Sequence, residues 1–167
     1  MTDRIWMYKL IGTVILLTAS MVYGRKKILD ERRKIREAEA LGALTEHIAE
    51  QIEYTMKPLP EIIAGFENGI LREIGFLETA GTYGIREAWK MCQWKFCLPE
   101  GNIRSAFGEF CREIGRGYRK EELELCGLTL KRLRSEIERM KGDSGNREKL
   151  YRTIPPLMVL SVVLILL

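Results

Sequence analysis

The sequence predicts an all-α fold, an antiparallel helical bundle flanked by an N-terminal and a C-terminal transmembrane helix. Between the two ends, apolar residues recur at spacings of three and four, with almost no sustained alternation of the kind that a strand requires. Residues 10–23 and 154–167 contain no charged residue, so nearly all of the 27 basic and 23 acidic residues lie between them. In a chain of 167 residues, this distribution argues against an ordinary soluble globular enzyme and indicates one domain with membrane anchors.

The N-terminal apolar segment, residues 5–23, is predicted to be the first transmembrane helix. It is interrupted only by Lys9, and as a helix it spans about 28 Å. The alternative is a cleaved signal peptide. The basic residues Arg25, Lys26 and Lys27 directly follow the segment, and this stop-transfer pattern favours a retained anchor.

The C-terminal apolar segment, residues 153–167, is predicted to be the second transmembrane helix. Pro155 and Pro156 suit the first turn of a helix, although the run is short and a buried core helix is the alternative. Basic residues concentrate on the side of each segment that faces the middle of the chain, which predicts a cytoplasmic central domain, residues 25–152, with both termini across the membrane. The predicted membrane-interface residues are Trp6, Lys9, Arg25, Lys26, Lys27 and Arg152.

The central domain is expected to contain five helices joined by short turns. Pro58 ends the first of them, because a proline bars the α conformation at the preceding residue and supplies no N–H. Turns are expected at residues 81–84 and 142–146, which are rich in glycine. The expected helices cover residues 25–56, 60–77, 85–96, 99–114 and 119–141.

The helix expected at residues 119–141 has the clearest apolar stripe. Its length of about two and a half heptads favours packing within one bundle over an intermolecular coiled coil, and leaves a homo-oligomer as an open alternative. The residues of the stripe are Leu123, Cys126, Leu130, Leu133, Ile137 and Met140.

Nothing in the sequence predicts catalysis, a cofactor or a metal site. The cysteines Cys92, Cys97, Cys111 and Cys126 have spacings that match no zinc or iron–sulfur framework, and we expect them to be reduced core residues. The single histidine, His47, lies at the edge of an apolar stripe with no nucleophile near it in the sequence. The chain is therefore expected not to be an enzyme and to bind no small-molecule substrate.

A basic cluster at residues 25–36 offers a different function. Polybasic segments beside a membrane attract anionic lipid headgroups, so the alternative function is a membrane-tethered helical domain with an anionic-lipid-binding or regulatory role. Asp30 and Glu31 interrupt the cluster and the net charge is only +4, which argues against nucleic acid as the partner.

Five short stretches carry a family resemblance over nearly the whole chain. They are Tyr8-Lys9-Leu10-Ile11-Gly12; Ile52-Glu53-Tyr54 with Pro58-Leu59-Pro60-Glu61; Glu87-Ala88-Trp89; Phe107-Gly108-Glu109 with Gly115; and Glu148-Lys149-Leu150-Tyr151-Arg152. In their order, spacing and position between two apolar ends, they resemble stage III sporulation protein AB.

The resemblance implies a non-enzymatic membrane platform or scaffold subunit of the complex that links the mother cell to the engulfed forespore, located at the outer forespore membrane. The helical domain of this family is similar to the cytoplasmic domains of the inner-membrane platform proteins of type II secretion and type IV pilus machines. By that analogy the chain would contact a secretion-type ATPase of the same complex, through residues 54–61 and the exposed face of the helix at 119–141. The predicted partner-binding residues are Tyr54, Pro58, Leu59, Pro60, Glu61, Arg132 and Arg134.

Overall fold

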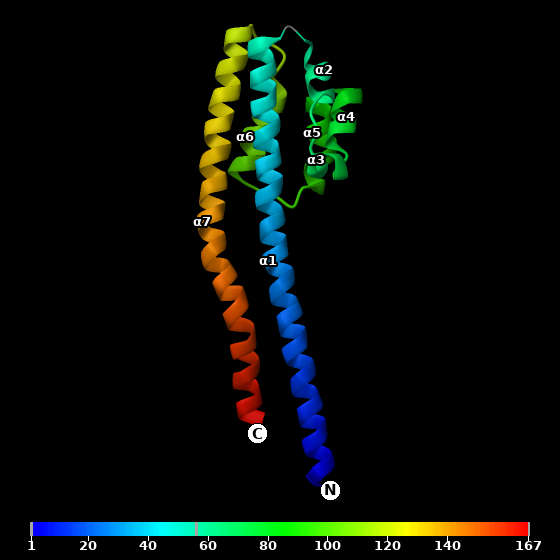
Figure 1. The fold of residues 1–167 in the computed structure, drawn as a ribbon, viewed down its shortest axis with the longest axis vertical. Helices are drawn as coiled ribbons and strands as arrows, with labels where there is room; N and C mark the ends of the chain where they lie inside the picture. Colours follow the sequence, from blue (N-terminus) through cyan, green and yellow to red (C-terminus); the bar gives the residue numbers. More distant parts are fainter. Residues whose placement is uncertain (1, 56, 167) are drawn as a thin grey trace. The chain divides into compact units, whose positions relative to one another are not determined.

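The computed structural model describes residues 2–55 and 57–166, and every regular element in them is a helix (Figure 1). This confirms the all-α part of the predicted fold class. The elements are α1 (Thr2–Tyr54), α2 (Leu59–Ala64), α3 (Gly69–Glu73), α4 (Phe76–Tyr83), α5 (Ile85–Cys92), the 3-10 helix η1 (Gln93–Lys95), α6 (Asn102–Glu113) and α7 (Arg119–Leu166).

The prediction of two flanking transmembrane helices, at residues 5–23 and 153–167, was wrong. Searching the described residues finds no helix with both the length and the apolar character that crossing a membrane requires. Polar side chains such as Lys9 and Thr18 lie within the first segment, and the second segment covers only about 22 Å as a helix, short of a hydrocarbon core of about 30 Å. An uncharged run at each end was therefore too weak a criterion for a membrane span.

The chain divides into two compact units. The terminal unit consists of Met1–Arg32 with Gly142–Leu167, and the central unit consists of Arg33–Lys141. In the terminal unit, the guanidinium of Arg32 donates to the carboxylate of Glu148 over 2.8 Å. The elements considered below for function belong to the central unit.

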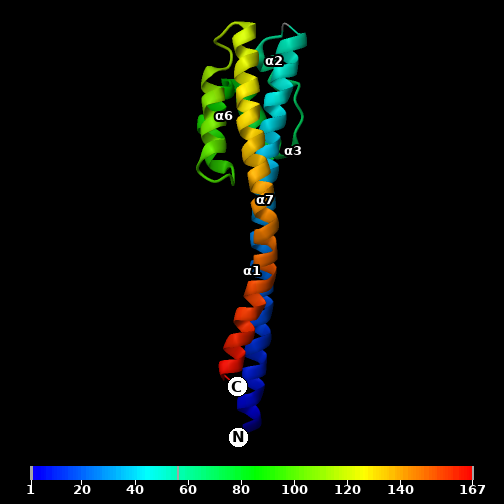
Figure 2. The same cartoon turned by 90° about the vertical axis from the view of Figure 1, so that its left-hand side faces the viewer.

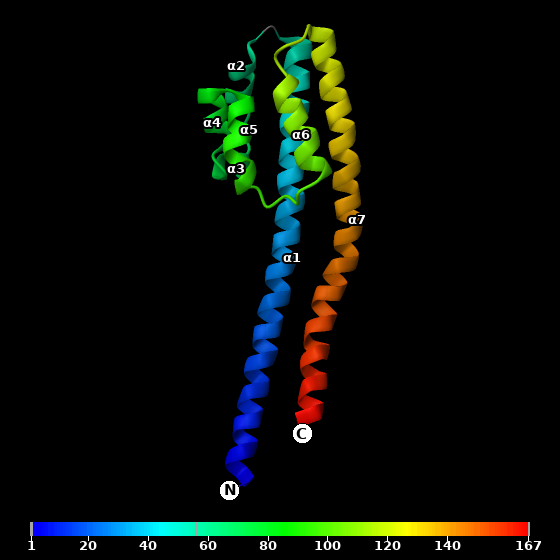
Figure 3. The same ribbon diagram turned by 180° about the vertical axis from the view of Figure 1, so that it is seen from behind.

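The parts of α1 and α7 that belong to the central unit run side by side with α6 (Figures 2 and 3). The short helices α2 to α5 form a cluster against α1. The inner face of α1 is buried at the positions that its apolar period predicts, including Leu41, Leu44 and Ile48. On α7 the predicted stripe residues Cys126, Leu133 and Ile137 are buried as well. The core also contains an aromatic cluster, which consists of Phe76, Trp89, Phe96, Phe107 and Phe110.

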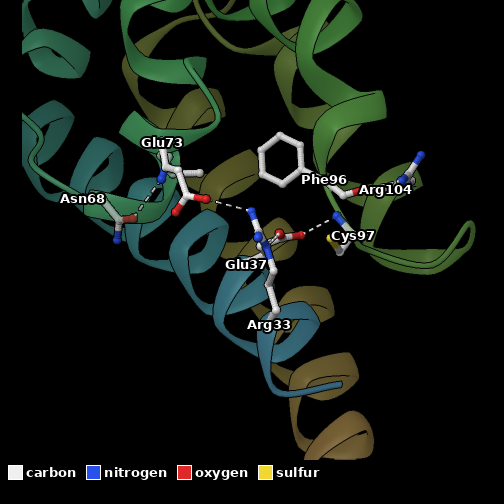
Figure 4. A network of polar contacts seen from close by, with 8 residues as sticks. Arg33, Glu37, Asn68, Glu73, Phe96, Cys97 and Arg104 are labelled. Carbon is white, nitrogen blue, oxygen red and sulfur yellow. Dashed lines mark hydrogen bonds and ion pairs between the residues drawn. The ribbon is translucent and has the colours of Figure 1, made fainter. Parts of the chain in front are cut away.

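The helix expected at residues 60–77 is instead three short helices. Asn68, labelled in Figure 4, starts α3, because its side-chain oxygen accepts hydrogen bonds from the backbone N–H groups of Ile70 and Leu71, each over 3.1 Å. Gly75 then takes a left-handed conformation at φ 79° and begins α4. The turn expected at 81–84 is reduced to Gly84, and residues 142–146 lie inside α7 rather than in a turn.

Candidate functional site

A surface groove lies where the Pro58-Leu59-Pro60 turn meets α1, α4, α5, α6 and α7. Pro58 is extended, at φ −66° and ψ 147°, and its carbonyl accepts the N–H groups of Glu61 and Ile62 in the first turn of α2. The groove has a volume of about 660 Å³. We call it the proline groove; its lining includes Ile52, Lys57, Pro58, Leu59, Pro60, Tyr83, Arg86, Glu87, Ile114, Gly115 and Glu122.

Three exposed tyrosines lie on the segments that form the proline groove. Tyr54 ends α1 with 79% of its surface exposed, Tyr83 lines the groove with 64% exposed, and Tyr118 precedes α7 with 83% exposed. The guanidinium of Arg119 donates to the backbone carbonyl of Glu53, so the end of α1 and the start of α7 lie next to each other. Tyrosine is enriched in protein interfaces, because it offers a large contact area together with a polar tip.

Gly115 forms the turn that follows α6 at the edge of the groove. Its φ is 83°, in the left-handed region that favours glycine, and a Cβ atom on it would lie 3.5 Å from Cδ2 of Leu59. The chain can therefore turn sharply after α6 while staying in contact with the second residue of the Pro58-Leu59-Pro60 turn. Two of the stretches that carry the sequence resemblance meet at this point.

The predicted partner-binding residues separate into two sets. Pro58, Leu59 and Pro60 line the proline groove, and Tyr54 and Glu61 are exposed on the segments beside it. The two arginines lie on other parts of the surface of α7 and contribute to two other hollows, one with Arg132 and one with Arg134.

Both arginines of α7 form ion pairs within the central unit. Arg132 reaches Glu109 of α6 over 3.1 Å, and Arg134 reaches Glu46 of α1 over 2.7 Å. Their side chains remain about two-thirds exposed, so each ion pair contributes little to the stability of the bundle. A role for these arginines in partner binding stays a prediction.

The predicted membrane-interface residues lie in the terminal unit. Arg25 and Lys26 are exposed and Lys27 is half-buried, whereas the side chains of Trp6, Lys9 and Arg152 fall outside the described residues. Within the basic cluster of residues 25–36, Arg32 and Arg33 already have carboxylate partners. The cluster therefore presents less uncompensated charge than its sequence suggests.

Sequence reasoning missed a buried carboxylate at the base of the central unit. Glu37 is fully buried; one of its oxygens accepts from Nε of Arg33 over 3.1 Å and the other from the backbone N–H of Cys97 over 2.6 Å (Figure 4). Arg33 also donates to Glu73 over 3.0 Å. The hydrogen bond to Glu37, followed by the charge of Glu73, raises the pKa of Arg33 above its ordinary value.

This network joins α1 to α3 and to the segment before α6. Arg104 extends it by donating to the backbone carbonyls of Phe96 and Leu98, over 2.9 and 3.0 Å. The sequence held one signal for it, the spacing of four between Arg33 and Glu37 beside the buried Ala38. The arrangement fixes the backbone of α1 relative to α3 and to the segment before α6.

The histidine and three of the four cysteines lie in contact with the packed interior of the central unit. Nε2 of His47 lies 3.3 Å from the carbonyl of Ile62. Three cysteines are buried as expected, whereas Cys97 is exposed, contrary to the core position predicted for it. Burial raises the pKa of Cys126 to about 11, which disfavours its reactive thiolate form. Among the described residues, no three His, Cys, Asp or Glu side chains gather as metal ligands would.

Comparison with known proteins gives one match. The family model described as stage III sporulation protein AB matches residues 9–167. Neither the curated proteins nor the solved structures contain a match to the chain.

Proposed function

Because the chain belongs to the stage III sporulation protein AB family, we propose that it is a non-enzymatic scaffold subunit of the secretion-like channel complex between the mother cell and the forespore. Membership of this family implies a role in sporulation. The finer proposal is that the chain acts on the mother-cell side of the complex and couples a secretion-type ATPase to the channel.

One observation carries the proposal: the proline groove and the three exposed tyrosines on the segments around it. Tyr54, Tyr83 and Tyr118 are each more than 60% exposed. Burying such side chains in an interface removes a large area from water, and few rotatable bonds have to be ordered. The rigid Pro58-Leu59-Pro60 turn adds little further loss of entropy on binding. A preformed surface of this kind suits a stable protein contact.

Photo-crosslinking tests the contact. A benzoylphenylalanine placed at Tyr54 or Tyr118 in a sporulating host should crosslink to the secretion-type ATPase, detected by immunoblotting. The matched control position is Leu29, which is exposed on α1. Crosslinking to the ATPase from Leu29 but from neither tyrosine position would refute the assignment of the interface.

Deletion tests the role in the complex. Without the gene, forespores should stop developing after engulfment, and the full chain should restore them. Spores that form normally without the gene would refute the proposal. The non-enzymatic part is tested by restoring the deletion with His47→Gln and with Cys97→Ser; loss of function in either variant, with the fold intact, would contradict it.

A further inference from the structure

A second surface of the central unit has the features of a binding face for an acidic partner. Along α5 and into η1, Arg86, Lys90 and Trp94 are spaced four residues apart. Along α6, Arg104, Gly108 and Arg112 have the same spacing. We call this surface the α5–α6 face.

Two contacts show that these two rows lie side by side and run in opposite directions. At one end, the guanidinium of Arg86 donates to the backbone carbonyl of Arg112 over 2.5 Å. At the other end, the guanidinium of Arg104 lies 6.0 Å from the centre of the Trp94 ring. Gly108 therefore lies midway along the face, opposite Lys90 and the neighbouring Trp89.

The guanidinium groups of this face are held by carbonyl oxygens, which carry no net charge. Arg104 donates to two backbone carbonyls and Arg112 donates to the carbonyl of Gly108. Among the described residues, no carboxylate lies within ion-pair distance of Arg86, Arg104 or Arg112. Lys90 is paired with Glu87 over 2.7 Å. Three positive charges thus remain uncompensated on the face.

Four basic side chains of α7 have carboxylate partners. Arg132, Arg134, Arg139 and Lys141 each lie within 3.1 Å of a carboxylate of the central unit. The three arginines of the α5–α6 face differ from them in this respect.

The middle of the face is formed by the backbone of α6. Nε1 of Trp89 would lie 2.9 Å from a Cβ atom on Gly108, so the indole packs directly against this glycine. Trp94, 71% exposed, supplies an apolar surface beside it.

We propose that the α5–α6 face binds an acidic segment of a partner protein, whose carboxylates pair with Arg86, Arg104 and Arg112 while an apolar side chain packs on Trp94. Carboxylates fit guanidinium groups through paired N–H donors. An exposed tryptophan beside arginines is typical of protein interfaces, whereas the Glu87 carboxylate within the face disfavours a continuous polyanion such as nucleic acid. This surface meets the proline groove at Arg86 and Glu87, whereas Trp94, Arg104 and Arg112 lie outside the groove, and it adds a second partner contact to the proposed function.

Fluorescence anisotropy on the full chain tests the proposal. The probe is a labelled peptide of about twelve residues that combines Glu with a few Leu, and its control has Gln in place of every Glu. The Glu peptide should bind at least about tenfold more tightly, with an affinity that falls as salt is raised. Trp94→Ala and Arg112→Glu should each weaken binding about tenfold.

Two substitutions on α7, outside the α5–α6 face, are the matched controls. Leu128→Ala removes an exposed apolar side chain and Lys131→Glu reverses an exposed charge, and both should leave the affinity within about twofold. Circular dichroism checks that each variant is folded, and Arg112→Gln replaces Arg112→Glu if the latter is not.

Three results would overturn the proposal. They are no binding of the Glu peptide, equal losses in the α7 controls, and tighter binding of single-stranded DNA or of phosphatidylglycerol vesicles with the same dependence on Trp94 and Arg112. Crosslinking from Tyr54 to the ATPase should persist in Trp94→Ala, so failure of this proposal and failure of the proline groove as an interface are separate outcomes.

Discussion

A Cβ atom on Gly108 would lie 2.9 Å from Nε1 of Trp89, closer than side chains pack. The Trp89 ring has little room to move, because it also packs against Phe107 and Phe96 at centroid distances of 5.0 and 5.5 Å. Only glycine at position 108 therefore lets α6 approach α5 in this way. Two of the stretches that carry the family resemblance are the two sides of this contact.

Gly108→Ala should lower the stability of the central unit. The overlap costs about 1 to 3 kcal/mol, and the higher helix propensity of alanine returns at most about 1 kcal/mol. Urea unfolding followed by tryptophan fluorescence measures the difference. Gly127→Ala is the control, since its Cβ meets no atom within 4 Å and should leave stability unchanged or raise it. Equal stability of the Gly108→Ala variant and the wild type would show that the helices can separate freely.

Replacing the buried Glu37 should destabilise the fold more than replacing an exposed carboxylate. Glu37→Ala leaves the backbone N–H of Cys97 without its acceptor and Arg33 without one of its two carboxylate partners. We expect the midpoint of thermal unfolding to fall by roughly 5 °C or more, and Glu37→Gln to recover part of the loss through its amide oxygen. Glu39→Ala, which removes the exposed partner of Lys141, should change the midpoint by less than about 2 °C. Similar midpoints for Glu37→Ala and Glu39→Ala would contradict a structural role for the network.

The apolar period predicted the long helices well and the short ones poorly. On α7 the period placed Cys126, Leu133 and Ile137 in the core, where they lie, because a helix that packs along its length keeps one face buried. The same period continued across residues 60–77 and hid the breaks between α2, α3 and α4. There the local signals, an Asn68-Gly69 start and a left-handed Gly75, decide the structure.

The site was only partly predictable because it is assembled from distant segments. The Pro58-Leu59-Pro60 turn is visible in the sequence, but Tyr83 and Gly115 reach the groove through the packing of other helices. The burial of Glu37 likewise depends on the backbone of Cys97, 60 residues away in the chain. Membrane spans were predicted from the two apolar segments and their approximate lengths, but among the described residues no helix is both long and apolar enough to cross a membrane.

Arg132 offers a way to separate surface charge from bundle stability. Arg132→Glu removes the ion pair with Glu109 and, if α7 faces the ATPase, should reduce crosslinking to it several-fold. The double exchange Arg132→Glu with Glu109→Arg restores an ion pair of opposite polarity. Crosslinking should stay low in the double variant if the partner recognises the charge on α7. Recovery in the double variant would assign the loss to the fold, and unchanged crosslinking in Arg132→Glu would remove this face of α7 from the interface.

The junction of α6 and α7 should weaken in acid through Glu136. Asn102 donates to one carboxylate oxygen of Glu136 over 2.7 Å, and Arg139 donates to the other. These hydrogen bonds, chiefly the one from Asn102 and next the one from Arg139, hold the pKa of Glu136 below its ordinary value of 4.5. Because the folded pKa is the lower one, this stabilisation is present above the ordinary value and is lost as the pH falls through the folded value. Asn102→Ala should therefore lower the thermal midpoint at pH 7, and its difference from the wild type should shrink below about pH 4. Ser135→Ala, a change in the same surface hollow, is the control and should have the thermal midpoint of the wild type at every pH. If the midpoint difference between Asn102→Ala and the wild type stays constant down to acid pH, the role of Glu136 is contradicted.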